Sequence, residues 1–232
     1  MHRESPESNS SACAIDIRGL EFSYSRGFRI VVKRLTIAPE EQVLLAGPSG
    51  SGKSTLLHLI AGVEHPSKGS ILIGGTDIVA LRRGAQDRFR GNHVGMIFQT
   101  FNLLHGFSAR ENVEVPLMLA GHSASEQRQL ALEALARLSI DAPDAPVDTL
   151  SVGQQQRVAV ARAIAGGKRV VLADEPTASL DRANAAATVA LIKEAAKRAG
   201  AALLMSSHDP EMREAFDRVV EIEEFTRGGA RP

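Results

Sequence analysis

Residues 43–55 read VLLAGPSGSGKST, an apolar run that leads at once into the pattern G-x-x-x-x-G-K-[ST]. A short apolar run that stops at glycines is typical of a buried strand in a parallel sheet. The pattern predicts a phosphate-binding loop, because its glycines let successive backbone N–H groups converge on an anion. A helix predicted from Lys53 to about Ala61 adds the positive end of its dipole. We expect the loop residues to contact the phosphates of a nucleotide, namely Gly47, Pro48, Ser49, Gly50, Ser51, Gly52, Lys53, Ser54 and Thr55.

Two side chains of this loop have separate predicted roles. Lys53 would reach the β- and γ-phosphates as a mobile point charge, and the hydroxyl of Ser54 would hold Mg²⁺. A glycine-rich turn that binds nothing is the alternative, and the strand before the loop and the helix after it argue against that alternative. The loop alone leaves open GTPases, small-molecule kinases, helicases and transporter ATPases.

The composition disfavours several other classes of protein. The 232 residues contain 27 Lys and Arg and 27 Asp and Glu, so the net charge is zero, which argues against a protein that coats nucleic acid or an anionic membrane. Aromatic residues make up only 4%, which disfavours a base-stacking surface, and the single Cys13 excludes an internal disulfide. No apolar run approaches the roughly 20 residues of a membrane span. We expect neither a nucleic-acid partner nor direct membrane insertion.

The chain divides into one large domain between two short tails. Residues 1–14 are rich in Ser and lack the apolar segment of a secretory signal, so we expect a flexible tail there and a second tail at 227–232. The domain would span 15–226. Alternation predicts a half-buried strand at 15–18, and β-branched runs predict edge or antiparallel strands at 30–32 and 35–37. Further strands are predicted at 71–73, 94–98, 170–173, 203–206 and 219–222.

Helical patterns lie between several of these strands. Ser123 and Glu126 have capping-box spacing ahead of an Ala- and Leu-rich stretch. A second Ala-rich helix is predicted from about 182 to 198. The stretch from about 101 to 166 lacks strand signals, so we expect a helical subdomain inserted in the core. The alternation favours an α/β fold with a mainly parallel sheet, accompanied by an antiparallel β subdomain.

A pair of acidic residues supplies a second candidate site. Residues 170–176 read VVLADEP, an apolar strand that ends in two carboxylates. Ligands bind at the carboxyl ends of the strands in α/β sheets, so Asp174 would position Mg²⁺ beside the phosphate loop, through water. Neighbouring strand residues point to opposite faces, and Glu175 would polarise the attacking water as a general base. Two solvated acids at a strand end are the alternative, which the phosphate loop disfavours.

Further segments, taken as a set, resemble the motifs of ABC-type ATPases. Residues 150–163 read LSVGQQQRVAVARA, similar to the signature motif of that family. Gln99 follows a predicted strand at the place of the Q-loop, residues 178–181 (ASLD) look like the D-loop, and His208 looks like the switch histidine. The resemblance covers nearly all of 15–222. It implies a P-loop NTPase core with a helical insert, ATP and Mg²⁺ as ligands, and hydrolysis of ATP to ADP and phosphate.

The resemblance also assigns a role to single residues. Tyr24 stands where the family has an aromatic ring that stacks on adenine, with an ordinary half-buried strand aromatic as the alternative. Gln99 would reach Mg²⁺ and the attacking water. His208 would contact the γ-phosphate and steady the water, and Asp181 would be the D-loop aspartate.

The signature segment lies at a predicted helix start. Ser151 can cap a helix, and the N–H groups around Gly153 can meet a γ-phosphate. In this family that ATP belongs to the opposite subunit, which implies a head-to-tail homodimer whose contacts come from Ser151, Val152, Gly153 and Gln154. The family usually has Gly at the position of Val152. A valine there is costly if the backbone needs a positive φ and tolerable if the backbone is helical.

Residues 98–117 resemble one branch of the family, the ATPase subunits of lipoprotein release and macrolide export, with the related cell-division ATPase. This likeness implies a separate integral membrane permease that docks near 99–107, and a cytoplasmic position on the inner face of the plasma membrane. Force transmission without transport is the alternative within the family. An ABC-type ATPase of DNA repair or translation is disfavoured by the neutral charge. A module that binds ATP without turnover is disfavoured by Glu175 and His208.

Overall fold

The computed structural model describes residues 13–24, 27–178 and 180–226. Most of the two predicted tails, at 1–14 and 227–232, therefore lies outside the described residues. Ala14 is an exception, because its side chain is buried and its N–H donates to the carbonyl oxygen of Ile37 over 2.8 Å. The packed chain thus includes Ala14, which the sequence-based prediction assigned to the tail.

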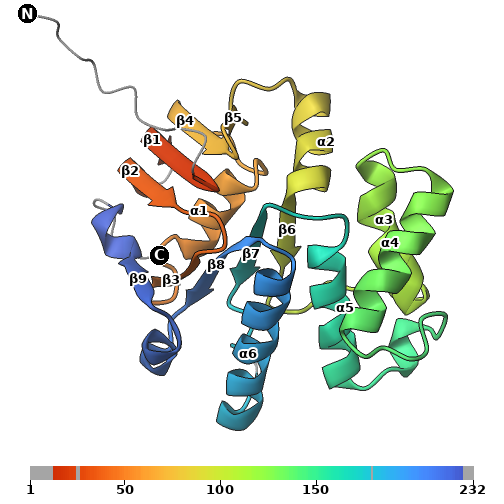
Figure 1. Ribbon diagram of the computed structural model, residues 1–232. Coiled ribbons are helices and arrows are strands. Elements are labelled where there is room, and N and C mark those ends of the chain that lie inside the picture. The colour runs from red at the N-terminus through yellow and green to blue at the C-terminus, as the bar shows by residue number, and fades with distance from the viewer. Residues whose placement is uncertain (1–12, 25–26, 179, 227–232) are drawn as a thin grey trace, which may run out of the picture.

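The described residues form two β-sheets (Figure 1). The smaller sheet is antiparallel with the order β2-β1-β4-β5, and its strands are β1 (Ile15–Ser23), β2 (Arg29–Ile37), β4 (Lys68–Ile73) and β5 (Thr76–Asp77). The two short strands predicted at 30–32 and 35–37 are one strand, β2. The exposed Lys33 and Arg34 do not interrupt it, because main-chain pairing with β1 continues on both sides of them.

The larger sheet has five strands in the order β6-β7-β8-β3-β9, and every neighbouring pair is parallel. Its strands are β3 (Gln42–Ala46), β6 (Val94–Ile97), β7 (Val170–Asp174), β8 (Ala202–Ser207) and β9 (Arg218–Glu221). The predicted α/β fold with a mainly parallel sheet and an antiparallel part is confirmed. Because all five strands run the same way, their carboxyl ends meet at one edge, where β3 enters the phosphate loop and β7 ends at Asp174.

The α-helices of the described residues are α1 (Lys53–Ile60), α2 (Arg83–His93), α3 (Ala109–Leu119), α4 (Ala124–Arg137), α5 (Val152–Ile164) and α6 (Arg182–Arg198). Shorter 3-10 helices are η2 (Val147–Thr149), η3 (Pro210–Ala215) and η4 (Ile222–Glu224). The capping box predicted at Ser123 is confirmed, and similar boxes at Ser108 and Ser151 start α3 and α5. Helix α2 was not predicted, because it presents no apolar stripe and Gln86 is its only buried residue.

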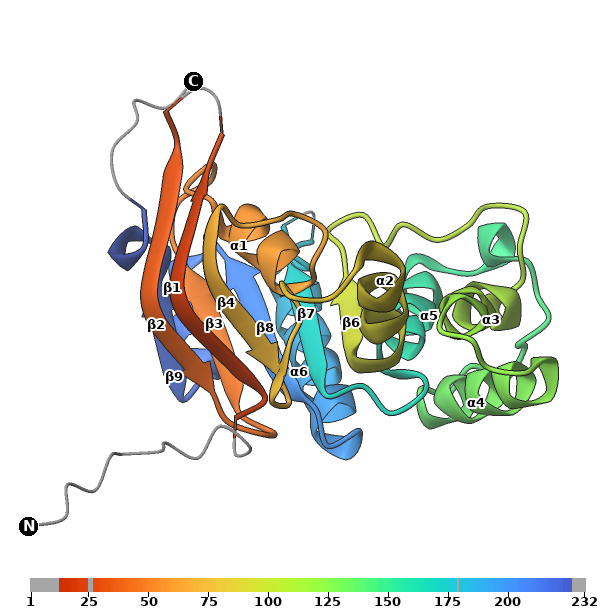
Figure 2. The same cartoon turned by 90° about the horizontal axis from the view of Figure 1, so that it is seen from above.

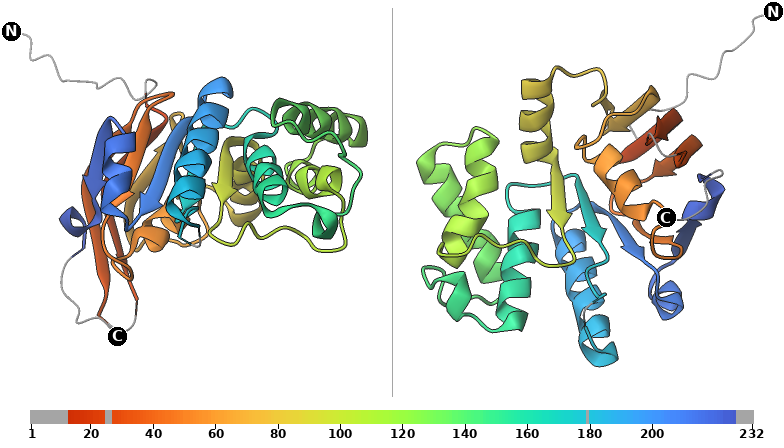
Figure 3. Two further views of the ribbon diagram at one scale, coloured as in Figure 1. Left: turned by 90° about the horizontal axis from the view of Figure 1, so that it is seen from below. Right: turned by 180° about the vertical axis from the view of Figure 1, so that it is seen from behind.

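Successive residues of the parallel strands face two different cores. In β3, for example, Val43 and Leu45 pack with α1 and the antiparallel sheet, whereas Leu44 and Ala46 pack with α6 and the helices from α3 to α5. Figures 2 and 3 show the same layers, with the antiparallel strands on one side of the parallel sheet and α6 on the other. Burial of both faces explains why the parallel strands read as continuous apolar runs.

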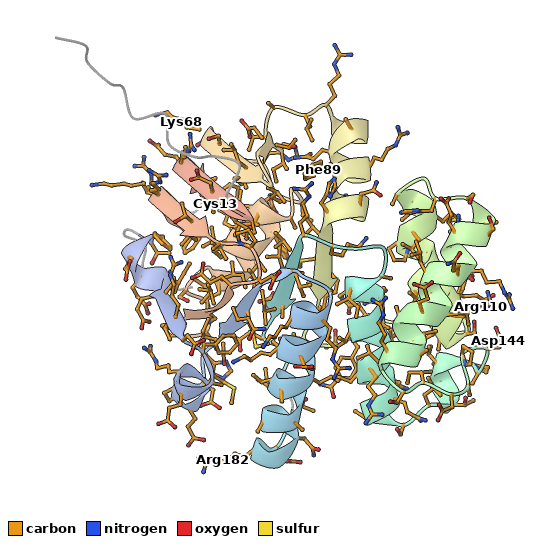
Figure 4. All side chains as sticks on the ribbon, viewed as in Figure 1. Cys13, Lys68, Phe89, Arg110, Asp144 and Arg182 are labelled. Carbon is orange, nitrogen blue, oxygen red and sulfur yellow. The ribbon has the colours of Figure 1, made fainter. Side chains whose placement is uncertain are left out.

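The region 101–166 holds α3, α4 and α5 and no β-strand, in agreement with the lack of strand signals there. In Figure 2 these helices lie at the end of the molecule opposite the antiparallel sheet. At its outer rim, Arg110 of α3 pairs with Asp144, with 2.7 Å between Nε and Oδ1 (Figure 4). Among the residues that the structure describes, no helix combines the length and the apolar character needed to cross a bilayer.

One buried charge in this fold has a testable effect on stability. Burial lowers the pKa of the Lys168 ammonium to about 8, from 10.5, and its Nζ donates to the carbonyl oxygen of Gly91. Between these two pH values the unfolded chain binds more protons than the folded chain, so stability rises with pH. We predict that the free energy of unfolding of wild type, relative to Lys168→Met, rises by up to about 1.4 kcal/mol per pH unit across that window.

Urea unfolding of both proteins at a series of pH values measures this difference. Lys197→Met is the control, because Lys197 is exposed on α6 and its replacement should leave the pH dependence of wild type unchanged. Parallel stability curves for wild type and Lys168→Met would contradict the prediction, because they would show that folding does not lower the pKa of the Lys168 amine.

Candidate active site

The phosphate loop connects the end of β3 to the start of α1. Gly52 caps α1 in a left-handed conformation with a φ of 101°, and a Cβ atom there would lie 2.3 Å from the ring of Phe28. A Cβ atom on Gly47, which has a φ of 149°, would lie 2.3 Å from Ile222. Both positions therefore require glycine. Pro48, Ser49 and Gly50 are exposed, so the loop is open to an anion at the N-terminus of α1.

Lys53 is the first residue of α1 and is only 4% exposed. Its Nζ donates to the carbonyl oxygens of Gly47 and Pro48, over 2.8 and 2.9 Å. The same Nζ lies 3.0 Å from Oε1 of Glu175. The three protons of the ammonium are thus directed at three oxygens of the site. A phosphate that enters the loop must compete with these oxygens for the lysine.

Asp174 ends β7 and reaches the phosphate loop across β8. Its Oδ1 accepts the hydroxyl protons of Ser54 over 3.0 Å and of Ser206 over 2.8 Å. Its Oδ2 accepts no hydrogen bond from any residue that the structure describes. The structure therefore brings together two of the three residues predicted to hold a metal, Ser54 and Asp174.

Glu175 follows β7 with a φ of 47°, in the left-handed region, and its side chain is 13% exposed. Its N–H donates to Oγ of Ser206 over 2.9 Å. Its two carboxylate oxygens have different partners, because Oε1 lies 3.0 Å from Nζ of Lys53 and Oε2 lies 2.6 Å from Nδ1 of His208. The predicted general base and the predicted switch histidine are thus in direct contact at the phosphate loop.

The oxygen atoms at this edge fit a small divalent cation. The hydroxyl of Ser54 and the carboxylate of Asp174 are ligands of the kind that Mg²⁺ prefers. Within the described part of the chain, no group of three or more His, Cys, Asp or Glu residues could hold a metal ion. A cation here would take its remaining ligands from phosphates and water, which is usual for Mg²⁺.

Tyr24 lies just beyond β1 and is 44% exposed, so it is less covered than an ordinary half-buried strand aromatic. Its ring meets Phe22 edge to face, with 4.8 Å between the ring centroids. Phe28, whose ring centroid is 6.3 Å from that of Tyr24, lies against Gly52 of the phosphate loop. Phe28 therefore borders the loop, and Tyr24 lies next to Phe28 on the side of β1.

Gln99 lies two residues beyond β6, and its side chain is exposed. Because β6 pairs in parallel with β7, Gln99 is at the same edge of the sheet as Asp174. Its side chain forms no hydrogen bond with any described residue, so it is not bonded to Ser54 or Asp174 in the structure.

The signature residues form an open surface at the start of α5. Ser151 caps the helix, because its Oγ accepts the N–H of Gln154 over 3.3 Å and its own N–H donates to the side chain of Gln154 over 3.0 Å. Val152 is the first helical residue and has no positive φ, so a valine is tolerable there. Its side chain is 62% exposed. A Cβ atom on Gly153 would meet no atom within 4 Å, so nothing inside this chain requires glycine at that position.

Asp181 caps α6. Its side chain accepts the N–H of Asn184 over 3.0 Å and the side-chain amide of the same residue over 2.6 Å. A helix cap is therefore one role of Asp181 that the structure shows. Ser179, another residue of the predicted D-loop, lies outside the described residues.

The loop after Gln99 is connected to the segment that precedes the signature. Asp148 accepts from Nδ1 of His105 over 2.5 Å and from the N–H of Gly106 over 2.9 Å. The hydrogen bond from His105 is the main cause that lowers the pKa of the Asp148 carboxyl. One residue earlier, the N–H of Val147 donates to the carbonyl oxygen of Phe107 over 3.0 Å. These hydrogen bonds connect the loop to the residues directly before α5, the helix that begins with the signature segment.

Arg162 of α5 adds a second connection to the same loop. It donates to the carbonyl oxygens of Phe101 and Asn102 over 2.5 and 2.6 Å. On the outer side of the loop, Leu104 and Phe107 are 39% and 44% exposed. The loop thus presents apolar side chains outward while its backbone is held by α5.

Two residues of the site were missed by the sequence-based prediction. Ser206 could have been noticed as a hydroxyl at the end of an otherwise apolar strand, directly before Ser207 and His208. Phe28 carries no such signal, because its contact with the loop depends on how the β1–β2 hairpin folds over Gly52. A groove of about 960 Å³ runs along α6 and η3, and none of the predicted site residues lines it.

Known proteins resemble this chain over most of its length. A profile of the family described as "ABC transporter" matches residues 33–178. The lipoprotein-releasing system ATP-binding protein LolD of Anaeromyxobacter dehalogenans is 43% identical over 190 residues, which cover 81% of this chain and 80% of that protein. The macrolide export ATP-binding/permease protein MacB of Bradyrhizobium diazoefficiens is 42% identical over 189 residues, which cover 81% of this chain but only 29% of that longer protein.

Solved structures resemble the fold as well. The dimeric, post-hydrolysis structure of the ATP-binding cassette MJ0796 bound to ADP and Pi has a TM-score of 0.73 at 31% identity, and the match covers 89% of this chain and 93% of that one. CbiO1 from Clostridium perfringens, part of the ABC transporter complex cbiONQ, has a TM-score of 0.79 at 28% identity, over 90% of this chain and 84% of that one. Sequence and structure thus agree over most of the length, and the chain belongs to the ABC transporter family as one of its ATPases.

Proposed function

We propose that this chain powers a separate membrane permease, of the lipoprotein-release or macrolide-export type, by hydrolysing ATP between two head-to-tail copies of itself. The position of Glu175 supports this proposal most strongly. Its carboxylate is 13% exposed and lies 3.0 Å from the lysine of the phosphate loop. A carboxylate that is close to the phosphates, but distinct from the metal-holding Asp174, can take a proton from an attacking water.

Nucleotide binding would use the loop backbone and two side chains. The backbone N–H groups of the loop, which Pro48 alone lacks between Gly47 and Thr55, would surround the phosphates at the positive end of the α1 dipole. Lys53 would leave the carbonyl oxygens of Gly47 and Pro48 for the phosphates, which are stronger acceptors. Tyr24 would stack on adenine with the exposed face of its ring.

Ser54 and Asp174 would hold Mg²⁺, and Gln99 would approach from its place beyond β6. When bound, the ion neutralises charge on the phosphate oxygens. The contact between Ser54 and Asp174, 3.0 Å from oxygen to oxygen, supports their joint role. Because Gln99 has no partner among the described residues, its side chain is available for this position.

Hydrolysis would depend on an exchange of partners at Glu175. In the structure, Oε1 of Glu175 pairs with Lys53 and Oε2 pairs with His208. When Lys53 turns to the phosphates, Oε1 loses its partner and becomes the acceptor for a proton from water. His208 keeps the other oxygen in place and, near the γ-phosphate, steadies the same water.

The second copy of the chain would close the site with its signature surface. The start of α5 presents N–H groups and a positive dipole end to the outside, from Ser151 to Gln154. Open space at Gly153 and the exposed Val152 are expected of a surface that meets another subunit. Asp181, near the same interface, would act as the D-loop aspartate in addition to capping α6.

The exposed loop 101–107 would dock the permease. Leu104 and Phe107 supply an apolar contact. The hydrogen bond from His105 to Asp148, and the one from the N–H of Val147 to the carbonyl oxygen of Phe107, connect that contact to the signature segment. Docking and closure over ATP would thus be mechanically linked. The chain would act at the cytoplasmic side of the plasma membrane through this partner.

Replacing the general base gives a direct test of hydrolysis. Glu175→Gln keeps the shape of the side chain but removes its ability to take a proton, so ATP turnover is expected to fall by at least about 100-fold. ATP should then remain bound and the dimer should accumulate, as measured by size-exclusion chromatography with light scattering. Glu194→Gln, on the exposed side of α6, is the matched control and should behave as wild type. Wild-type turnover in Glu175→Gln would exclude the role of general base.

The metal ligands are tested by the Mg²⁺ requirement. Asp174→Asn removes the negative charge that favours the cation, so the Mg²⁺ concentration for half-maximal ATP hydrolysis is expected to rise roughly 10-fold or more. Removal of Mg²⁺ with EDTA should stop hydrolysis in wild type. Asp217→Asn, an exposed aspartate outside the site, should leave the Mg²⁺ requirement unchanged. An unchanged requirement in Asp174→Asn would assign the metal to other residues.

The docking surface is tested by photo-crosslinking in native membranes. A photoreactive phenylalanine analogue placed at Phe107 is expected to crosslink to an integral membrane protein, because the side chain is exposed on the docking loop. The same analogue at Glu214, exposed in η3, should not do so. Crosslinks that are absent at both positions, or equal at both, would contradict docking through this loop.

A further inference from the structure

Strand β8 carries, one residue before its end, a hydroxyl group that solvent does not reach. Ser206 is 0% exposed, and it follows four apolar residues of the strand. Because β8 lies between β3 and β7, Ser206 stands between the strand of the phosphate loop and the strand of the acidic pair. A buried hydroxyl needs hydrogen-bond partners. Both partners of Ser206 belong to the acidic pair, Asp174 and Glu175.

The direction of these two hydrogen bonds is determined by the donors. The backbone N–H of Glu175 can only donate, and it does so to Oγ of Ser206 over 2.9 Å. The single hydroxyl proton of Ser206 is therefore given to Oδ1 of Asp174 over 2.8 Å. One hydroxyl thus connects the carboxylate of one acid to the backbone of the next.

The first consequence concerns the backbone of Glu175. Its φ of 47° is in a region that residues other than glycine rarely adopt, and such a conformation persists only where its surroundings impose it. β7 ends at Asp174, so the ladder with β8 does not extend to Glu175, and the N–H of Glu175 relies on the side chain of Ser206. This hydrogen bond helps to determine the direction in which the Glu175 carboxylate leaves the strand.

The second consequence concerns the carboxylate of Asp174. Its Oδ1 accepts from Ser206 and from Ser54, whereas its Oδ2 accepts from no described residue. Two hydroxyl donors on one oxygen restrict rotation of the carboxylate. The second oxygen is then kept available for the cation that the donor set fits.

We propose that Ser206 is a positioning residue for ATP hydrolysis, whose hydroxyl keeps the metal-holding carboxylate of Asp174 and the general base Glu175 in one fixed arrangement. This inference rests on the proposed function of the site. Ser206 makes no hydrogen bond to the loop backbone or to Lys53 in the described structure. Its loss should therefore reduce turnover and leave ATP affinity unchanged.

The matched variants Ser206→Thr and Ser206→Val test this role. They have nearly the same shape, so any crowding in the buried site is common to both, and they differ in the hydroxyl group alone. With the full chain, ATP and Mg²⁺, we expect kcat of Ser206→Thr to stay close to wild type. We expect kcat of Ser206→Val to be roughly 10- to 100-fold lower, with KM for ATP unchanged, since a small misplacement of catalytic groups has this effect.

Hydrogen–deuterium exchange without nucleotide supplies a readout that does not depend on turnover. The backbone N–H of Glu175 is expected to exchange faster in Ser206→Val than in Ser206→Thr, because it has lost its acceptor. Thr188→Val controls for the loss of any buried hydroxyl, since the hydroxyl of Thr188 donates to the carbonyl oxygen of Asn184 in α6 and accepts from the side chain of Gln156 in α5, and it bonds to neither acid. It should lower the melting temperature without changing kcat.

Equal kcat and equal exchange in the two Ser206 variants, in a chain that hydrolyses ATP, would overturn the positioning role and leave the proposed function intact. A parallel rise in KM would also overturn it, because the residue would then act on binding. Absence of hydrolysis in wild type with Mg²⁺ would overturn the proposed function itself.

Discussion

The ion pair between Lys53 and Glu175 determines what the surrounding residues have to do. Lys53 is 4% exposed and Glu175 is 13% exposed, and charges so nearly removed from water are tolerated only when they are paired and hydrogen-bonded. The carbonyl oxygens of Gly47 and Pro48 accept hydrogen bonds from the lysine, and His208 is hydrogen-bonded to the carboxylate. A nucleotide bound as proposed would replace one anionic partner of the lysine with another. The positive charge that would compensate the phosphates is therefore in place before the nucleotide binds.

The order of the parallel sheet explains why these groups come from such distant parts of the chain. β3 carries the phosphate loop and β7 carries the acidic pair, but β8 separates them. The contact between Ser54 and Asp174 therefore crosses an intervening strand, whose last residues have to be compatible with polar neighbours on both sides. Ser206 and His208 meet that requirement, one within the sheet and one beyond its edge. The site therefore depends on β8 as well as on the two motifs carried by β3 and β7.

Motifs with a local physical cause could be predicted from the sequence. The loop glycines and the cap at Ser151 follow from backbone geometry within a few residues, and the meeting of Asp174 with the loop follows from parallel strands that end at one edge. Other features depend on partners far away in the sequence. The helical backbone at Val152, the ring of Phe28 against Gly52 and the buried bonds of Ser206 are set by tertiary packing. Helix α2 was not predicted for a different reason: Gln86 is its only buried residue, so its sequence shows no apolar stripe.

The position of β3 in the sheet also affects how the chain folds during synthesis. β3 ends at residue 46, yet both of its neighbours, β8 and β9, lie beyond residue 200. The backbone N–H and C=O groups of this apolar strand stay unpaired until β8 and β9 have been synthesised, whereas β1, β2 and β4 can pair much earlier. An unpaired apolar strand is a template for aggregation. The strand that leads into the phosphate loop is thus made early and paired late, so the strand order of this sheet exposes it to aggregation during synthesis.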